Sequence, residues 1–196
     1  MVTDDLRDRL RGAFRWTDPG PPADYLVSDR SGWWRDPVIL DGLGPALADL
    51  FRADRPTVVV SPEVTGFLLG PLVARALGVG FVEAYRAGAR RAIAEPMIWA
   101  EVPADHRGDI QHLGVRRERL AVDDRVLVVD DWAATGSQAR GLRKLVGDRY
   151  IGTAVIVDEC PPGVTAELTI RSLLSAADLE PIVECDAPQS DASPPR

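Results

Sequence analysis

Residues 126–138 read Val-Leu-Val-Val-Asp-Asp-Trp-Ala-Ala-Thr-Gly-Ser-Gln, and this stretch decides the fold. Its apolar start predicts a strand buried on both faces, as in a parallel sheet. Small residues and the start of a helix follow the strand, and both favour an anion held by backbone N–H groups. Asp130 and Asp131 supply carboxylates that accept hydrogen bonds from sugar hydroxyls. Because ligands of open parallel sheets bind beyond the carboxyl ends of the strands, the stretch predicts a sugar-phosphate pocket.

This stretch has two alternative interpretations. In the first, the aspartates only cap and turn a structural strand–turn–helix unit. Two acids followed by Ala-Ala-Thr-Gly-Ser exceed what a cap requires, which disfavours that interpretation. The second is a nucleoside-triphosphate P-loop, which needs a Gly-Lys-Ser/Thr step. The only lysine in the chain is Lys144, well inside the following helix, so a P-loop is disfavoured as well.

The composition is that of an ordinary globular chain. It has 196 residues, with 27% charged and 45% hydrophobic residues, which predicts one domain over residues 1–185 with a disordered polar tail at 186–196. A formal net charge of −7 argues against general nucleic-acid binding. Cys160 and Cys185 lack metal-type spacing, and the charged N-terminus is unlike a signal peptide. We therefore expect a cytoplasmic protein with no membrane partner.

Hydrophobic periodicity and glycine or proline breaks give an alternating order of elements. Helices are expected at residues 3–16, 43–51, 67–77, 137–146 and 165–175. Strands are expected at residues 57–60, 80–84, 125–130, 150–158 and 181–184. Residues 24–36 are expected to be aromatic and irregular, and residues 86–112 to form loops with one possible hairpin. This alternation predicts an α/β fold with a parallel sheet flanked by helices.

A second anion-binding loop is expected at residues 81–91. There a strand ends and Arg86, Ala87 and Gly88 follow as a tight turn. Small residues free backbone N–H groups, and Arg86, Arg90 and Arg91 supply positive charge. The alternative is a solvated basic turn without a ligand.

These segments together resemble the type I phosphoribosyltransferases, most of all the adenine (purine) enzymes. The acid pair and Thr/Gly-rich loop match the family's motif for 5-phosphoribosyl-1-pyrophosphate (PRPP). The Arg86 loop is similar to the family's Arg-Lys-x-Gly-Lys loop, but alanines stand where lysines are usual. Residues 63–70 resemble the family's turn into a helix, with Thr65 where an arginine that holds pyrophosphate is usual. Residues 32–36 resemble its Phe-Arg-Asp segment, with Trp34 and Arg35 in the first two places.

The resemblance implies a fold, a reaction and roles for residues. It implies a Rossmann-like parallel sheet with a small N-terminal hood at about residues 20–40 and a flexible loop at about 89–112. PRPP and a nucleobase are the implied substrates, Mg²⁺ is bound with PRPP rather than directly by the protein, and the assembly is a homodimer. The implied catalytic residues are Asp131, Asp130, Asp105, Glu101 and His106. The implied binding residues are Ala133, Ala134, Thr135, Gly136 and Ser137 for the 5-phosphate; Arg86, Ala87, Gly88, Arg90 and Thr65 for pyrophosphate; and Trp34 and Arg35 for the base.

The favoured function is therefore transfer of 5-phosphoribose to a purine, preferably adenine, with release of pyrophosphate and formation of a nucleoside 5′-monophosphate. The flexible loop lacks the family's Glu-Tyr pair, and Thr65 replaces an arginine. These departures leave open another acceptor, such as xanthine, guanine or a base of a specialised pathway. They also leave open a non-catalytic protein that senses PRPP or a nucleotide on the same fold.

Overall fold

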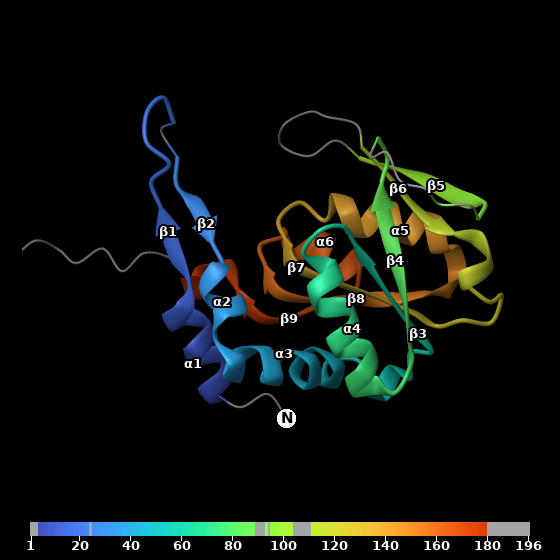
Figure 1. Ribbon diagram of the computed structural model, residues 1–196, viewed down its shortest axis with the longest axis horizontal. Helices are drawn as coiled ribbons and strands as arrows, with labels where there is room; N and C mark the ends of the chain where they lie inside the picture. Colours follow the sequence, from blue (N-terminus) through green and yellow to red (C-terminus); the bar gives the residue numbers. More distant parts are fainter. Residues whose placement is uncertain (1–3, 24, 89–92, 94, 104–110, 180–196) are drawn as a thin grey trace, which may run out of the picture.

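A central sheet of seven strands carries the fold in this computed structural model, which describes residues 4–23, 25–88, 93, 95–103 and 111–179. The strand order is β5-β6-β4-β3-β7-β8-β9. The strands of this sheet are β3 (Val58–Pro62), β4 (Gly80–Arg86), β5 (Met97–Val102), β6 (Gln111–Arg116), β7 (Val126–Ala133), β8 (Tyr150–Asp158) and β9 (Ile170–Ser175). The strands from β4 through β3 and β7 to β9 pair in parallel, whereas β5 and β6 form an antiparallel hairpin beside β4. The expected α/β fold is confirmed (Figure 1).

Strand β7 is buried on both faces, as its apolar run predicts. Leu127 and Val129 pack into one hydrophobic cluster, and Val126 and Val128 pack into another. Alternate side chains of a strand point to opposite faces, so one continuous Val/Leu run serves two cores. The strand continues to Ala133, which places both aspartates at its end inside the sheet.

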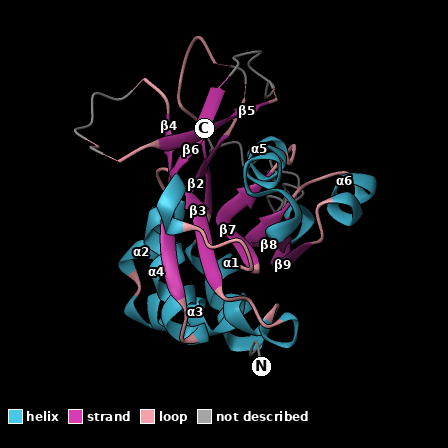
Figure 2. Ribbon diagram, turned by 90° about the vertical axis from the view of Figure 1, so that its right-hand side faces the viewer, coloured by secondary structure: helices cyan, strands magenta, loops and turns pink. Residues whose placement is uncertain are grey.

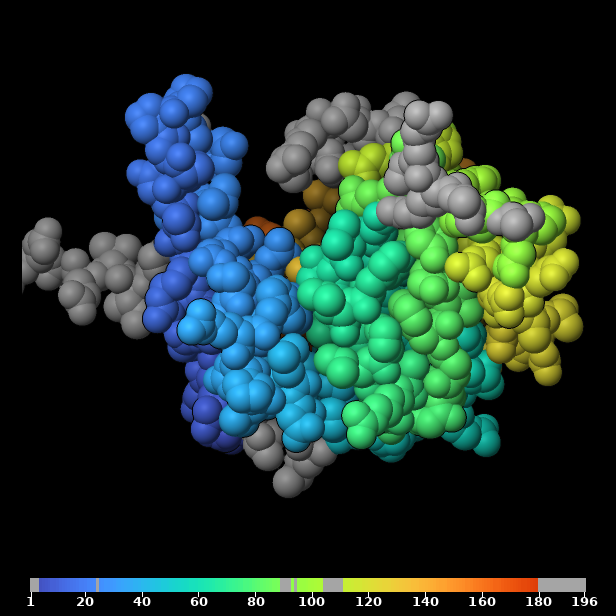
Figure 3. Space-filling model, viewed as in Figure 1, coloured from blue at the N-terminus to red at the C-terminus, as the bar shows by residue number. Residues whose placement is uncertain are grey.

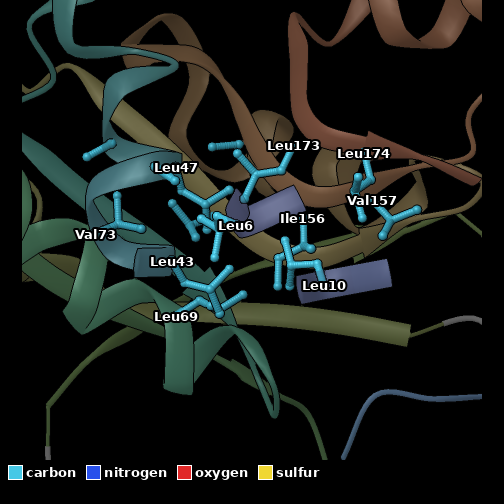
Figure 4. Packing of buried hydrophobic residues seen from close by; sticks show 14 of the residues in the cluster. Leu6, Leu10, Leu43, Leu47, Leu69, Val73, Ile156, Val157, Leu173 and Leu174 are labelled. Atoms are coloured by element: carbon cyan, nitrogen blue, oxygen red, sulfur yellow. The ribbon is translucent and has the colours of Figure 1, made fainter. Parts of the chain in front are cut away.

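Helices cover both faces of the sheet (Figure 2). Helices α1 (Asp4–Ala13), α3 (Pro37–Asp49) and α4 (Gly66–Leu77) share the larger hydrophobic cluster with β8 and β9. Their leucines converge on Ile156 and Leu173 (Figure 4). Helix α5 (Ser137–Val146) packs on the opposite face, against β5 and β7, and the short helix α6 (Pro162–Glu167) contacts β9. The carboxyl ends of the central strands lie between these two layers of helices.

The N-terminal segment forms a small unit beside the sheet. It consists of α1, the hairpin of β1 (Arg15–Thr17) and β2 (Val27–Asp29), and α2 (Ser31–Arg35). The hairpin projects beyond the body of the molecule, and a recess separates it from the sheet (Figure 3). Residues 24–36 were expected to be irregular, so β2 and α2 correct that prediction. The helix expected at residues 3–16 ends at Ala13, and β1 begins at Arg15. Strands of three residues carry too little alternation to be found by period alone.

The C-terminal part differs most from expectation. A helix at residues 165–175 is wrong, because α6 ends at Glu167 and β9 follows at Ile170–Ser175. Ile170, Leu173 and Leu174 are spaced as on a helix, but the free edge of β8 supplies parallel hydrogen-bond partners. Thr169 turns the chain between the two elements with φ +45°. The strand expected at 181–184 and the tail from 186 lie outside the described residues.

Helix α3 also begins earlier than expected. Asp36 caps it by accepting hydrogen bonds from the backbone N–H groups of Val38 (2.8 Å) and Ile39 (3.4 Å), and Pro37 occupies the first turn. This Asp-Pro start was visible in the sequence as a helix signal. Among the described residues, no helix is long and apolar enough to cross a bilayer.

Helix α4 lies so close to the sheet that Gly70 admits no side chain. A Cβ there would approach Cε2 of Phe81 to 2.3 Å and Oγ of Ser61 to 2.6 Å. We expect Gly70→Ala to lower the free energy of unfolding by about 1–3 kcal/mol, because the packed core must shift. Gly12→Ala is the matched control in α1, where a Cβ would meet nothing within 4 Å. Urea unfolding of both variants measures the effect, and equal stability of the two would contradict the close approach.

Candidate functional site

The polar residues of the site lie where β3, β4 and β7 end. The chain runs from β3 outward to β4, and then from β7 outward to β9 on the other side, so the strand order reverses between β3 and β7. Such a switch point opens a crevice at the carboxyl ends of the strands. A cavity of about 160 Å³ lies there, lined by residues including Arg86, Asp130, Trp132 and residues 133–138. The structure thus brings the expected phosphate loop, Asp130 and Arg86 to one cavity.

The phosphate loop connects β7 to α5 by a sharp turn at Gly136. Gly136 has φ +73°, and a Cβ there would lie 2.7 Å from Cγ1 of Val164 and 2.8 Å from Cδ1 of Leu168. The hydroxyl oxygens of Thr135 and Ser137 lie 2.7 Å apart, and Oγ1 of Thr135 also accepts from the N–H of Ser137 at 3.3 Å. Two hydroxyls and the first N–H groups of α5 are therefore gathered at one loop, as an anion requires.

The acid pair is buried, with Asp130 8% and Asp131 5% exposed. Oδ1 of Asp130 accepts the backbone N–H of Asp131 at 2.9 Å. Oδ2 of Asp131 accepts Nη1 of Arg30 at 2.6 Å. Burial and the neighbouring charge of Asp131 raise the pKa of Asp130 well above its usual value, because both disfavour a second negative charge. The positive charge of Arg30 therefore acts on both carboxylates, by an ion pair with Asp131 and at longer range on Asp130.

The raised pKa of Asp130 has a consequence for stability. A carboxyl whose pKa is higher in the folded than in the unfolded state loses stability as pH rises from the unfolded pKa, about 3.9, toward the folded pKa. We expect Asp130→Asn to raise the free energy of unfolding at pH 7, and this gain to vanish below about pH 4. Denaturation at several pH values checks the prediction, with Asp148→Asn on the exposed surface as control. A gain independent of pH would contradict it.

Arg86 connects four elements of the site. Its Nε donates to the backbone oxygen of Glu63 at 3.0 Å, Nη1 donates to Oε1 of Gln111 at 2.6 Å, and Nη2 donates to Oε1 of Gln138 at 3.1 Å. The backbone N–H of Arg86 also donates to Oε2 of Glu63 at 3.1 Å. Nε2 of Gln138 in turn reaches Oδ2 of Asp130 at 3.5 Å. The expected pyrophosphate arginine is therefore linked to the acid pair by one glutamine.

The other expected pyrophosphate residues that the structure describes do not line the cavity. Ala87 and Gly88 are exposed at the end of β4, where Gly88 has φ +93°. Thr65 is half-buried at the start of α4 and does not line the cavity. The peptide bond between Glu63 and Val64 is cis. The expected residues Arg90, Asp105 and His106 lie outside the described part of the chain.

Asp131 and three further expected site residues do not line the cavity. Glu101 is exposed on β5, and its neighbour Val102 is buried against the cavity, because successive strand residues face opposite sides. Trp34 lies on α2, half-buried against the large hydrophobic cluster, and Arg35 is exposed on the same helix. The adjacent Trp33 is fully buried and donates from Nε1 to the backbone oxygen of Leu10 at 2.9 Å. The base-binding role of Trp34 and Arg35 thus finds no support in this geometry.

Sequence reasoning missed several residues of the site. Trp132 lines the cavity and donates from Nε1 to Oε2 of Glu159 at 2.7 Å. Gln138 directly follows the phosphate loop, and both residues could have been found from their position beside the motif. Arg30 and Gln111 carry no motif, and only the tertiary structure brings them to the acid pair and to Arg86.

Comparisons with known proteins agree with this geometry. Adenine phosphoribosyltransferase of Streptomyces galbus is 31% identical over 91% of this chain and 94% of its own length. Xanthine phosphoribosyltransferase of Brevibacillus brevis is 32% identical over 63% of this chain and 64% of its own length. Among solved structures, adenine phosphoribosyltransferase of Rhodothermus marinus has a TM-score of 0.73 and 23% identity, covering 88% of this chain and 99% of that one. No protein-family model matches the chain.

The chain belongs to the type I phosphoribosyltransferase family. The resemblance to the adenine enzymes expected from the sequence is confirmed, because relatives about 30% identical to the chain span most of it. A phosphoribosyltransferase needs an anion loop beside paired acids, and the structure places Thr135–Ser137 and Asp130 in one cavity. The family also accounts for the order of strands around the site, since the solved phosphoribosyltransferases share this fold.

Proposed function

We propose that this phosphoribosyltransferase transfers 5-phosphoribose from PRPP to a ring nitrogen of a purine, with adenine favoured. The observation that carries the proposal is the single cavity shared by the phosphate loop, Asp130 and Arg86 at the switch point of the sheet. Its support is the set of adenine phosphoribosyltransferases about 30% identical to this chain. A second acceptor, xanthine, is favoured by the similarity to the enzyme of Brevibacillus brevis.

In the proposed reaction, the bond from ribosyl C1 to pyrophosphate breaks and a bond from C1 to the base nitrogen forms. The loop from Ala133 through Ala134 to Ser137 holds the 5-phosphate by backbone N–H groups and two hydroxyls. Asp131 and Asp130 accept the ribose hydroxyls and stabilise the positive charge that develops at C1. Arg86 turns toward the leaving pyrophosphate, aided by the N–H groups of Ala87 and Gly88. The base loses a proton as its bond to C1 forms. Asp105 and His106, which lie outside the described residues, are the proposed acceptors of this proton, and water is the alternative.

Mg²⁺ is proposed to arrive with PRPP and to neutralise its pyrophosphate. The donors of the site fit this arrangement better than a resident metal. No cluster of three or more His, Cys, Asp or Glu side chains occurs among the described residues. Asp130 and Asp131 would face such a metal through water, since their oxygens already accept from the Asp131 N–H and from Arg30.

A cytoplasmic homodimer is the arrangement that the family resemblance implies. We propose one phosphoribosyltransferase domain over residues 1–185, with a hood at about residues 20–40 that includes β2 and α2. Analytical ultracentrifugation tests the dimer.

Release of pyrophosphate from PRPP tests the function directly. The purified chain is incubated with PRPP, Mg²⁺ and, separately, adenine, guanine, hypoxanthine and xanthine, and pyrophosphate and nucleoside monophosphate are measured. Turnover with adenine as the best acceptor is expected, and preference for another base changes the acceptor only. Binding of PRPP without turnover of any base would reject the enzyme and favour the PRPP-sensing alternative.

A further inference from the structure

Arg30 joins the N-terminal unit to the acid pair. It stands between β2 and α2, and its Nη1 lies 2.6 Å from Oδ2 of Asp131. The side chain of Asp131 is 8% exposed and that of Arg30 is 32% exposed. An ion pair buried on the carboxylate side has a strongly preferred geometry, because few water molecules compete for the oxygen.

The guanidinium of Arg30 also lies over the ring of Trp132. Its Cζ lies 6.0 Å from the centroid of the Trp132 ring. Trp132 is held in turn by Glu159 and by an aromatic cluster, with centroids 5.9 Å from Phe14 and 6.3 Å from Trp16. A planar, delocalised cation suits a site between a carboxylate and an aromatic ring, whereas an ammonium group fits it less well.

The backbone that carries Arg30 is also fixed. Oδ1 of Asp29 accepts the N–H of Ser31 at 2.8 Å, which holds the turn from β2 into α2. At Gly32, an added Cβ would lie 2.2 Å from the backbone oxygen of Ala13, so α2 packs directly on the end of α1. The hood therefore delivers Arg30 to Asp131 from a packed element rather than from a free loop.

We propose that Arg30 is a positioning residue for phosphoribosyl transfer, which orients the Asp131 carboxylate toward the ribose of PRPP. This inference rests on the proposed function. A carboxylate has about four lone-pair positions, so Asp131 accepts ribose hydroxyls while Arg30 holds its Oδ2. The N-terminal unit thus contributes to the proposed donor site through Arg30.

The test compares Arg30→Gln and Arg30→Lys with the wild-type protein. We expect Arg30→Gln to lower kcat/KM for PRPP by about 10- to 100-fold, since the carboxylate loses its orientation. Arg30→Lys keeps the charge without the planar fork and is expected to lose less. Arg9→Gln is the matched control, because Arg9 lies in the same N-terminal unit and pairs with the exposed Asp5 at 3.1 Å. It is expected to behave as wild type.

The pH profile of kcat/KM is a second measurement, and it would not change if Arg30 only stabilised the fold. The groups facing Asp130 are Asp131 of the same strand, Arg30 of the hood and, through Gln138, Arg86 of β4. The charge of Arg30 lowers the pKa of Asp130 in part, against burial and Asp131, which raise it. Without that charge the acid limb of kcat/KM is expected to move to higher pH in Arg30→Gln, and to stay in place in Arg9→Gln and Arg30→Lys.

A double-mutant cycle separates action through Asp131 from any direct contact. The Kd of PRPP is measured for wild type, Arg30→Gln, Asp131→Asn and the double variant. If Arg30 acts through Asp131, its removal changes Kd much less in the Asp131→Asn background than in the wild type. Equal changes in both backgrounds would overturn the proposal.

The outcomes distinguish this inference from the proposed function. Failure of the wild-type protein to bind PRPP rejects both. In another outcome, the wild-type protein turns over PRPP normally while Arg30→Gln keeps the wild-type kcat/KM and acid limb. That result rejects the positioning role of Arg30 and leaves the proposed function standing. Circular dichroism and the melting temperature establish that each variant is folded. If Arg30→Gln does not fold, Arg30→Met takes its place, and wild-type kcat/KM in Arg30→Met overturns the inference.

Discussion

Asp131→Asn is expected to lower kcat/KM for PRPP by about 100- to 1,000-fold. Asparagine has the same shape as aspartate, but it lacks the charge that stabilises the cationic ribosyl group in the transition state. It also loses the ion pair with Arg30, in which Nη1 lies 2.6 Å from Oδ2 of Asp131, since the amide oxygen is neutral. Initial rates of pyrophosphate release at varied PRPP and saturating adenine measure the loss.

The fold of Asp131→Asn is expected to stay intact. Loss of the ion pair destabilises the folded state, but the substitution also removes the repulsion between Asp131 and the buried Asp130. Arg30 is one-third exposed and regains water. The melting temperature should therefore move little, and Asp123→Asn on the exposed surface serves as control for both activity and melting. Normal activity of Asp131→Asn would refute its role in the reaction.

Gly136→Ala is expected to raise KM for PRPP by about 10- to 100-fold. The left-handed backbone at φ +73° disfavours any residue with a Cβ, and the Cβ would meet the side chains of Val164 and Leu168 below 3 Å. The loop must move, and the N–H groups and hydroxyls that hold the 5-phosphate move with it. We also expect the free energy of unfolding to fall by about 1–3 kcal/mol.

Gly163→Ala is the matched control for Gly136→Ala. Gly163 lies in α6, next to Val164, and a Cβ there would meet nothing within 4 Å. Its KM for PRPP is expected to equal that of wild type. Isothermal titration with PRPP distinguishes weaker binding from slower chemistry, and a wild-type Kd in Gly136→Ala would show that the turn is not needed for the phosphate.

Local patterns in the sequence were sufficient for the central part of the molecule. The run before Asp130 predicted β7 on apolar composition alone, and Gly147 marked the end of α5 at the residue where the structure ends it. The same method failed at residues 170–175, where the apolar residues are spaced as on a helix but form β9. There the open edge of β8 decided the outcome, and a neighbour distant in sequence is invisible to a local pattern.

The functional site likewise has one part that the sequence predicts and another that only the tertiary structure shows. The phosphate loop and the acid pair are contiguous, so the sequence by itself determined the family and the donor. The resemblance implies that Trp34 and Arg35 bind the base, but Trp34 packs against the core and Arg35 is exposed on α2. Arg30, distant from the motif, is the arginine that reaches Asp131. Only the tertiary structure decided this, because the burial of α2 and the hairpin register fix which side chain of the hood faces the acid pair.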